Sequence, residues 1–266
     1  YFAMHQYFQE NEKKDVVAFS SGNHAQGVAY SANLMGVKAT IVMPDDTPKT
    51  KIQKTESLGA KVIFYDRYNE SRQEIAKKIA TETGAFLIPA YDHYDVISGQ
   101  GTAALEAIHQ MALIDEKVDY FICPVGGGGL MAGCCIAIKH YFEQCNIIGV
   151  EPELFNDTQL SLSKGKRVSI DINQNTLCDA LMAKTPGKLT FPINQKFITE
   201  VATVNEHEIK EAMRFAYNEF NLVVEPGGIV GLASAMKHRF SIENANILIL
   251  LSGGNVDLDR FDELIK

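Results

Sequence analysis

Four consecutive glycines, Gly126, Gly127, Gly128 and Gly129, are the strongest chemical signal in the sequence. An apolar run precedes them and an amphipathic segment over residues 130–141 follows, which indicates a strand, a loop and a helix start. Glycines let successive backbone N–H groups approach one small anion, and the helix N-terminus adds partial positive charge. The pattern therefore predicts a phosphate site, with a plain flexible turn as the alternative. It matches neither the dinucleotide nor the triphosphate glycine pattern.

A second group of polar residues follows another apolar run, residues 16–19. Ser20, Ser21, Asn23 and His24 crowd the turn that leads into the next predicted helix. At the carboxyl edge of a parallel sheet, such a turn faces the ligand crevice. Helix capping by Ser21 or Asn23 explains the same residues equally well, and the pattern alone gives His24 no catalytic role.

A third loop, which begins at Ser252, has two glycines and follows the apolar run 247–251. Each of the three loops is a weak signal by itself, but loops at the carboxyl ends of strands can converge on one crevice. Their convergence is the prediction that favours a ligand site.

The segments that position these loops alternate between apolar runs and helical periodicity, which is typical of βαβ units around a parallel sheet. We therefore predict an α/β fold. Buried strands are expected at residues 16–19, 39–43, 61–64, 120–124, 147–150 and 247–251. Helices are expected at residues 24–35, 48–58, 71–83, 101–112, 130–141, 206–220 and 228–238, with Gly36, Gly59 and Gly84 as stop signals.

Composition excludes several classes of protein. The chain is 46% hydrophobic and 22% charged, as in ordinary globular proteins. A formal net charge of −8 without a long basic run argues against nucleic acid as a partner. Neither a membrane span nor a signal peptide is recognisable, so a cytoplasmic protein is expected. The five cysteines have no C-x-x-C spacing and are expected to be reduced core thiols.

Taken together, these motifs resemble the pyridoxal-phosphate enzymes of fold type II, and within them the serine/threonine dehydratase (threonine ammonia-lyase) and serine racemase branch. The resemblance spans nearly the whole chain. It rests on SSGNHAQG from Ser20, TESLGAKV from Thr55, SGQGTAALE from Ser98, PVGGGGLMAG from Pro124, GVEPE from Gly149, VEPGG from Val224 and LSGGNVD from Leu251.

The resemblance implies two parallel-sheet domains of the tryptophan synthase β-like fold. Residues 15–91 would form the small domain, and residues 1–14 and 92–266 the large one. The chain ends soon after the last motif, so no regulatory ACT domain is expected.

Pyridoxal 5'-phosphate is the cofactor that the resemblance implies. The four glycines and Leu130 match the site of its phosphate, Asn23 the residue at its 3'-oxygen, and Ser252 the partner of its pyridine nitrogen. A hydroxyl cannot hold a proton on that nitrogen as an aspartate does, so the ring is a weaker electron sink. Prompt β-elimination is then favoured over transamination.

Substrate residues follow from the same resemblance. Ser20, Ser21, Asn23 and His24 match the loop that receives the substrate carboxylate, and backbone N–H groups and short hydroxyls suit an anion. Ser21 also matches the second proton carrier of racemases. Arg72 matches an arginine that closes on the substrate, although a solvated helix arginine is an equal alternative.

A divalent cation is implied as well. Glu151, Asp157 and the carbonyl of Phe155 match the cation site of the racemases, and such hard oxygen ligands suit magnesium or calcium. Exposed acidic residues after a strand are the alternative.

The family's catalytic lysine lies in a Ser-Phe-Lys-x-Arg-Gly-Ala motif, which the printed sequence does not contain. The resemblance puts this lysine a few positions before Tyr1, so we expect the chain to lack an N-terminal segment and to be inactive by itself. Lys49, Lys51 and Lys54 are expected on a solvated helix face.

These assignments imply deamination of L-threonine or L-serine to a 2-oxo acid and ammonia. The resemblance also implies a homodimer, and neither nucleic acid nor membranes are expected as partners. Serine racemase or hydroxyaspartate dehydratase activity is the alternative among enzymes. A non-catalytic fragment that binds the cofactor or an anion is the alternative of another class.

Overall fold

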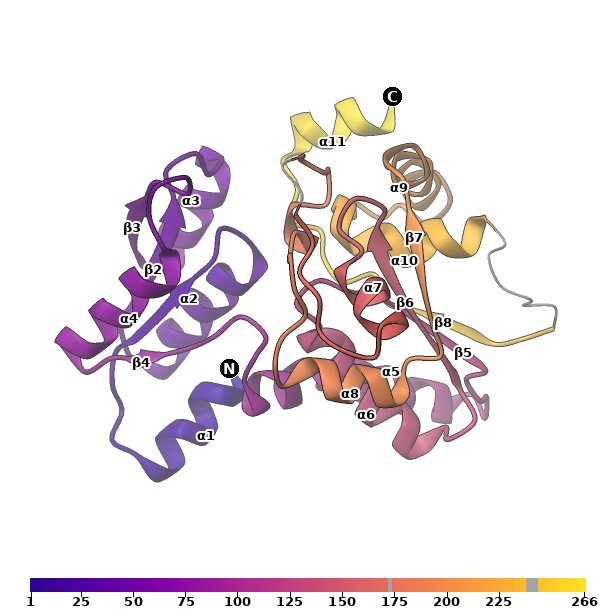
Figure 1. Ribbon diagram of the computed structural model, residues 1–266, viewed down its shortest axis with the longest axis horizontal. Coiled ribbons are helices and arrows are strands. Elements are labelled where there is room, and N and C mark those ends of the chain that lie inside the picture. The colour runs from indigo at the N-terminus through magenta and orange to yellow at the C-terminus, as the bar shows by residue number, and fades with distance from the viewer. Residues whose placement is uncertain (172–173, 238–243) are drawn as a thin grey trace. The chain divides into compact units, whose positions relative to one another are not determined.

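The computed structural model describes residues 1–171, 174–237 and 244–266 (Figure 1). They form two compact units, Tyr1–Gly99 and Gln100–Lys266. Each unit contains a four-stranded sheet in which every strand pair is parallel. This confirms the predicted α/β fold with two parallel sheets.

The first unit surrounds a small sheet. Its elements are α1 (Phe2–Glu10), β1 (Val16–Phe19), α2 (Asn23–Met35), β2 (Ala39–Pro44), α3 (Lys49–Ser57), β3 (Lys61–Tyr65), α4 (Arg72–Thr83) and β4 (Phe86–Leu87). The strand order is β3-β2-β1-β4. Val16 and Ala18 of β1 pack in one cluster with α2, whereas Val17 packs in another with Ala76 of α4. Successive strand residues thus serve opposite faces, and a helix covers each face.

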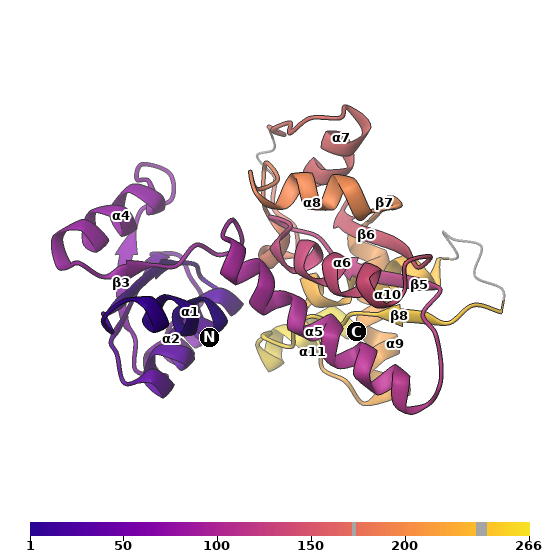
Figure 2. The same ribbon diagram turned by 90° about the horizontal axis from the view of Figure 1, so that it is seen from below.

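The second unit surrounds the larger core. Its elements are α5 (Tyr94–Leu113), which begins in the first unit, β5 (Tyr120–Pro124), α6 (Gly129–Tyr141), β6 (Asn146–Pro152), α7 (Asp157–Ser163), η1 (Asp179–Leu181), α8 (Thr190–Phe197), β7 (Glu200–Val204), α9 (Glu206–Phe220), α10 (Pro226–Met236), β8 (Ile247–Ile249) and α11 (Leu258–Ile265). The strand order is β7-β6-β5-β8. Figure 2 shows α5 running alongside α6.

The core of this unit again has two faces. Phe121 and Cys123 of β5 pack in a cluster with residues of α5 and α6, whereas Ile122 packs in a cluster with residues of α9, α10 and α11. Burial on both faces explains why β5 reads as a continuous apolar run.

All six predicted strands are present, and β5 has its predicted bounds. The short strand β4 and the edge strand β7 were not predicted. The helix α5 begins at Tyr94 rather than at residue 101, and α10 begins at Pro226 rather than at residue 228. The predicted end of α10 at His238 lies outside the described residues.

The predicted small domain, residues 15–91, falls inside the first unit. Ala3 and Met4 of α1 also belong to a core cluster of that unit. The assignment of residues 1–14 to the large domain stays a prediction.

Two predictions about the whole chain can also be compared with the structure. The five cysteines are free and buried, which agrees with reduced core thiols. In the described part of the chain, no helix combines the length and hydropathy needed to cross a bilayer.

Candidate functional site

The four glycines lie between β5 and α6, as predicted. Val125 still donates its N–H to the Val150 carbonyl at 2.9 Å, so the sheet continues to the loop. Gly128 caps α6 with a φ of 89°, and the Ala132 N–H donates to its carbonyl at 2.9 Å. The N–H groups before Ala132 have no acceptor within a helix, and they lie at its positive end. The loop therefore has the properties of an anion site.

Ser252 lies at the same edge of the same sheet. The strand β8 pairs with β5, with Ile249 opposite Ile122, and the Leu250 N–H donates to the Ile122 carbonyl at 2.9 Å. Continuing this register by three residues puts Ser252 opposite Val125, the residue before the glycines. The structure thus brings Ser252 and the glycine loop to adjoining strand ends within one unit.

The start of α10 holds the loop that contains Ser252. The Ser252 N–H donates to the Gly228 carbonyl at 3.3 Å, and the Glu225 N–H donates to the Gly253 carbonyl at 2.9 Å. A Cβ at Gly228 would lie 2.7 Å from the Gly253 oxygen, so no side chain fits there. Gly228, the second glycine of the VEPGG segment, is needed for this close approach.

In the first unit, the loop after β1 and the first turn of α2 carry predicted substrate residues. The helix α2 begins at Asn23 with Gly22 as its N-cap, and no side chain of the described residues caps it. The Ser20 Oγ accepts the Gly22 N–H at 3.2 Å, within the loop. The N-cap position of α2 is thus occupied by Gly22 and by neither Ser21 nor Asn23, the two residues of the capping alternative.

His24 is tied to the scaffold of the first unit. Its Nε2 lies 3.1 Å from the Ile88 carbonyl, to which a neutral ring would donate. Burial lowers the pKa of His24, so the neutral ring is favoured. This contact makes His24 a residue that joins the loop after β1 to the end of β4.

Arg72 lies near the same loop. Its guanidinium carbon is 5.5 Å from the centre of the Phe19 ring, and Phe19 is the last residue of β1. The arginine is exposed at the first position of α4, which Ser71 caps by accepting the Glu74 N–H. Arg72 is thus within reach of an anion at the carboxyl end of β1.

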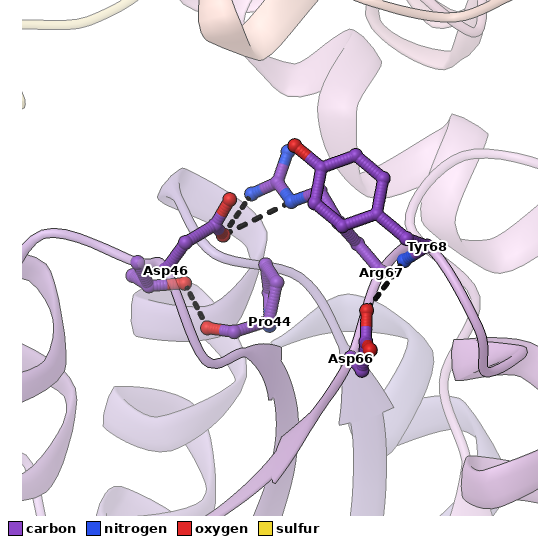
Figure 3. A network of polar contacts seen from close by, with 6 residues as sticks. Pro44, Asp46, Asp66, Arg67 and Tyr68 are labelled. Carbon is purple, nitrogen blue, oxygen red and sulfur yellow. Dashed lines mark hydrogen bonds and ion pairs between the residues drawn. The ribbon is translucent and has the colours of Figure 1, made fainter.

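Another polar network at this edge joins the loops after β2 and β3 (Figure 3). Both Nε and Nη2 of Arg67 donate to Oδ1 of Asp46, at 3.0 and 2.5 Å. Oδ1 of Asp66 accepts the Tyr68 N–H at 2.8 Å. Arg67 and Asp46 thus pair with each other, and Asp66 accepts hydrogen bonds within its own loop. We interpret the network as one that orders the two loops.

The predicted cation ligands form a buried acidic pair. Glu151 lies near the end of β6 and Asp157 begins α7, and both side chains are almost fully buried. The carboxylate of Glu151 accepts the N–H groups of Thr158 and Gln159, each at 2.9 Å. Among the described residues, neither oxygen of Asp157 has a hydrogen-bond partner.

The electrostatics of the pair fit a cation. Burial raises the pKa of Glu151 to about 7. Burial and then the charge of Glu151 raise the pKa of Asp157 to about 8. Two carboxylates buried near each other favour their neutral forms unless a cation compensates them. Three or more His, Cys, Asp or Glu side chains do not gather into a metal site in the described residues, so a backbone carbonyl such as that of Phe155 would have to complete the donors.

Sequence reasoning missed two residues that contact the glycine loop. Thr190 and Asn194 of α8 donate to the carbonyls of Gly127 and Gly128, at 2.8 and 3.2 Å. They are more than sixty residues away from the glycines along the chain. No local pattern in the sequence indicates this contact.

Comparison with known proteins identifies the family. Residues 1–253 match the family model described as pyridoxal-phosphate dependent enzyme. This chain belongs to that family. It is 39% identical to serine racemase of Schizosaccharomyces pombe over 264 residues, which cover 99% of this chain and 80% of that protein. It is 41% identical to L-threo-3-hydroxyaspartate ammonia-lyase of Saccharomyces cerevisiae over 257 residues, 97% of this chain and 77% of that protein.

The fold agrees with a solved structure of the same group. Maize serine racemase superposes with a TM-score of 0.91 at 35% sequence identity, over 98% of this chain and 79% of that one. These findings confirm the predicted family, its fold type, its cofactor and its class of lyases and racemases. The glycine loop fits the cofactor's phosphate, because its N–H groups lie at the start of α6 and its backbone has no room for side chains at Gly128.

Proposed function

We propose that this protein catalyses β-elimination of L-threonine or L-serine, which releases a 2-oxo acid and ammonia. The observation that carries this proposal is the adjacency of an anion-binding glycine loop and the uncharged Ser252 at neighbouring strand ends. The first feature suits the phosphate of pyridoxal phosphate, and the second suits its ring nitrogen.

The protein's own groups would divide the work of binding. The N–H groups of the glycine loop and of Leu130 would bind the phosphate, and Ser252 and Asn23 would orient the ring. When bound, pyridoxal phosphate supplies an electron sink that makes the α-proton of an amino acid acidic. Because Ser252 is neutral, it does not hold a proton on the ring nitrogen. This weaker sink favours early loss of the β-hydroxyl over transamination.

The first unit would bind the substrate. Ser20, Ser21, Asn23 and His24 would surround the substrate carboxylate, and Arg72 would add the positive charge that an anion requires. Burial keeps His24 neutral, so it can donate a hydrogen bond but contributes no charge. Ser21 would move a proton at the α-carbon if racemisation also occurs.

Glu151, Asp157 and the Phe155 carbonyl would hold a divalent cation, magnesium or calcium. The unpartnered oxygens of Asp157 in the described part of the chain support this assignment, because a buried carboxylate without a donor is costly. The cation would stabilise the end of β6 and the start of α7. We also expect a homodimer, which light scattering tests.

A second candidate is supported by the similarity to a serine racemase and to a hydroxyaspartate ammonia-lyase. Racemisation differs from elimination because the proton returns to the opposite face of the α-carbon. A hydroxyaspartate ammonia-lyase also eliminates, but its substrate has a second carboxylate that threonine and serine lack. Chiral analysis and the choice of substrate separate these activities.

The test measures 2-oxo acid formed from L-threonine, L-serine and L-threo-3-hydroxyaspartate by the product of the complete gene, with chiral chromatography of the remaining amino acid. We expect 2-oxo acid from threonine or serine. A D-amino acid without 2-oxo acid would support the racemase, and 2-oxo acid from hydroxyaspartate alone would support that lyase. The 266-residue polypeptide, assayed beside it, is expected to bind the cofactor without turnover, because it lacks the Ser-Phe-Lys motif.

A further inference from the structure

The inner side of α8 contacts the glycine loop through two buried side chains. Thr190 Oγ1 donates to the Gly127 carbonyl at 2.8 Å, and Asn194 Nδ2 donates to the Gly128 carbonyl at 3.2 Å. The exposed fractions of Thr190 and Asn194 are 0% and 1%. Residues four apart lie on one face of a helix, so one side of α8 contacts two successive peptide groups of the loop.

Neither carbonyl needs these side chains for its hydrogen bonding. The Gly127 oxygen also accepts the Gly187 N–H at 3.2 Å, and the Gly128 oxygen accepts the Ala132 N–H at 2.9 Å. Removing a side-chain donor would therefore leave neither oxygen buried and unpaired, which is the usual reason for a large loss of stability. Supplying a hydrogen-bond donor to the two loop carbonyls therefore does not explain the bonds from Thr190 and Asn194.

The bonds pair the buried donors of Thr190 and Asn194 themselves, and they also set the orientation of the two peptide groups. In a planar trans peptide, the carbonyl and the N–H of the next residue point in opposite directions. Bonds that hold the Gly127 and Gly128 carbonyls toward α8 therefore hold the N–H groups of Gly128 and Gly129 away from α8. Glycine has no side chain to restrict these peptide planes, so an outside contact is needed to fix them.

We propose that Thr190 and Asn194 are positioning residues that fix the glycine loop in its phosphate-binding conformation. In this role they act through the peptide groups of Gly127 and Gly128, to which they donate. The inference rests on the proposed role of the loop as phosphate site.

Asn194 offers a clear way to separate positioning from stability. Its Oδ1 is buried and has no hydrogen-bond partner within the described part of the chain. Asn194→Leu removes this unpaired oxygen together with the donor to Gly128, at similar volume. A purely structural role predicts a lower unfolding temperature for this variant. A positioning role predicts an unchanged or higher unfolding temperature and weaker binding of phosphate.

The experiment compares pyridoxal phosphate with pyridoxal, which lacks the phosphate, by calorimetric titration of the 266-residue chain. The dissociation constant of pyridoxal divided by that of pyridoxal phosphate measures what the phosphate contributes. We expect Thr190→Val and Asn194→Leu each to lower this ratio about tenfold, as loss of one orienting hydrogen bond implies. Thr190→Ser keeps the hydroxyl and should keep the ratio. Gln195→Ala, at an exposed position of the same helix, is the matched control.

The experiment distinguishes failure of the loop's phosphate role from failure of the positioning role of Thr190 and Asn194. A wild-type ratio near one would overturn the phosphate role of the loop, and this inference with it. A high wild-type ratio that Thr190→Val and Asn194→Leu both retain would overturn only the positioning role. Thermal unfolding of each variant verifies folding, and if Thr190→Val does not fold, Asn194→Leu decides.

Discussion

Gly128 and Asn194 are so close that a Cβ at position 128 would lie 2.6 Å from the Asn194 Nδ2. Gly128 also has a φ of 89°, which L side chains rarely adopt. Gly128→Ala must therefore displace the Asn194 side chain or the loop. We expect a loss of about 1–3 kcal/mol in the free energy of unfolding and at least about tenfold weaker binding of pyridoxal phosphate.

Gly165→Ala is the control for this substitution. Gly165 has a φ of 65° but nothing within 4 Å of an added Cβ, so it reproduces the backbone strain without the contact. It should lower stability while leaving cofactor affinity unchanged. Wild-type affinity in Gly128→Ala would contradict the role of the loop in binding phosphate. Denaturant unfolding and calorimetric titration measure the two quantities.

The acidic pair gives stability a defined dependence on pH. In the folded chain, the pKa values of Glu151 and Asp157 are raised from 4.5 and 3.8 to about 7 and about 8. The folded state then binds protons more tightly than the unfolded state across this range. Without a divalent cation, we expect the pair's contribution to stability to decrease as pH rises from about 4 to 8, by up to about 1.4 kcal/mol per pH unit for each group.

Magnesium or calcium should reduce this decline, because a bound cation favours the ionised carboxylates. Urea unfolding across the pH range, with chelator and with added cation, measures the effect. Identical curves with and without cation would contradict the proposed site.

Asp157→Asn tests the cation ligand directly. The amide is neutral and similar in shape, so it removes a buried charge that has no hydrogen-bond donor among the described residues. We expect stability in chelator at pH 8 to rise by about 1 kcal/mol or more, and stabilisation by magnesium or calcium to disappear. The control is Glu153→Gln, which removes an exposed carboxylate from the same segment and should change neither quantity.

Substrate binding by Arg72 predicts a specific kinetic change. Arg72→Met keeps a long apolar stem beside Phe19 but removes the charge. We expect KM for the amino acid to rise about tenfold to a hundredfold, as loss of a charge-assisted hydrogen bond implies. Lys77→Met removes a cation from an exposed position of the same helix and should leave KM unchanged. An unchanged KM in Arg72→Met would identify Arg72 as a solvated helix residue.

The strands were predictable from the sequence because both faces of the parallel sheets are buried. Continuous apolar runs such as the one that includes Cys123 are therefore unambiguous. The edge strand β7 begins with the exposed Glu200 and lacks such a run, and β4 has only two residues. Neither carries enough local signal to be recognised.

The helix starts were misjudged where glycines serve packing instead of ending a helix. Gly101 lies inside α5, and a Cβ there would be 2.7 Å from the Gly133 oxygen of α6.

Pro192 in α8 looks like a helix breaker, but it lies in the first turn, where its missing N–H costs nothing. Local patterns cannot distinguish these uses because the partner lies elsewhere in the chain.

For the candidate site, local motifs were sufficient for the residues on strand ends. The glycine loop and Ser252 could be foreseen because each follows a buried strand of one parallel sheet. Thr190 and Asn194 could not, because their role depends on the packing of α8 against the loop. The convergence of residues 20–24 with the glycine loop stays a prediction.

A crystal structure of the protein with pyridoxal phosphate tests the central claim most directly. We predict the phosphate on the N–H groups of residues 127–130, with the ring nitrogen within hydrogen-bond distance of the Ser252 hydroxyl. A phosphate bound away from the glycine loop, or a ring that does not reach Ser252, would contradict this claim.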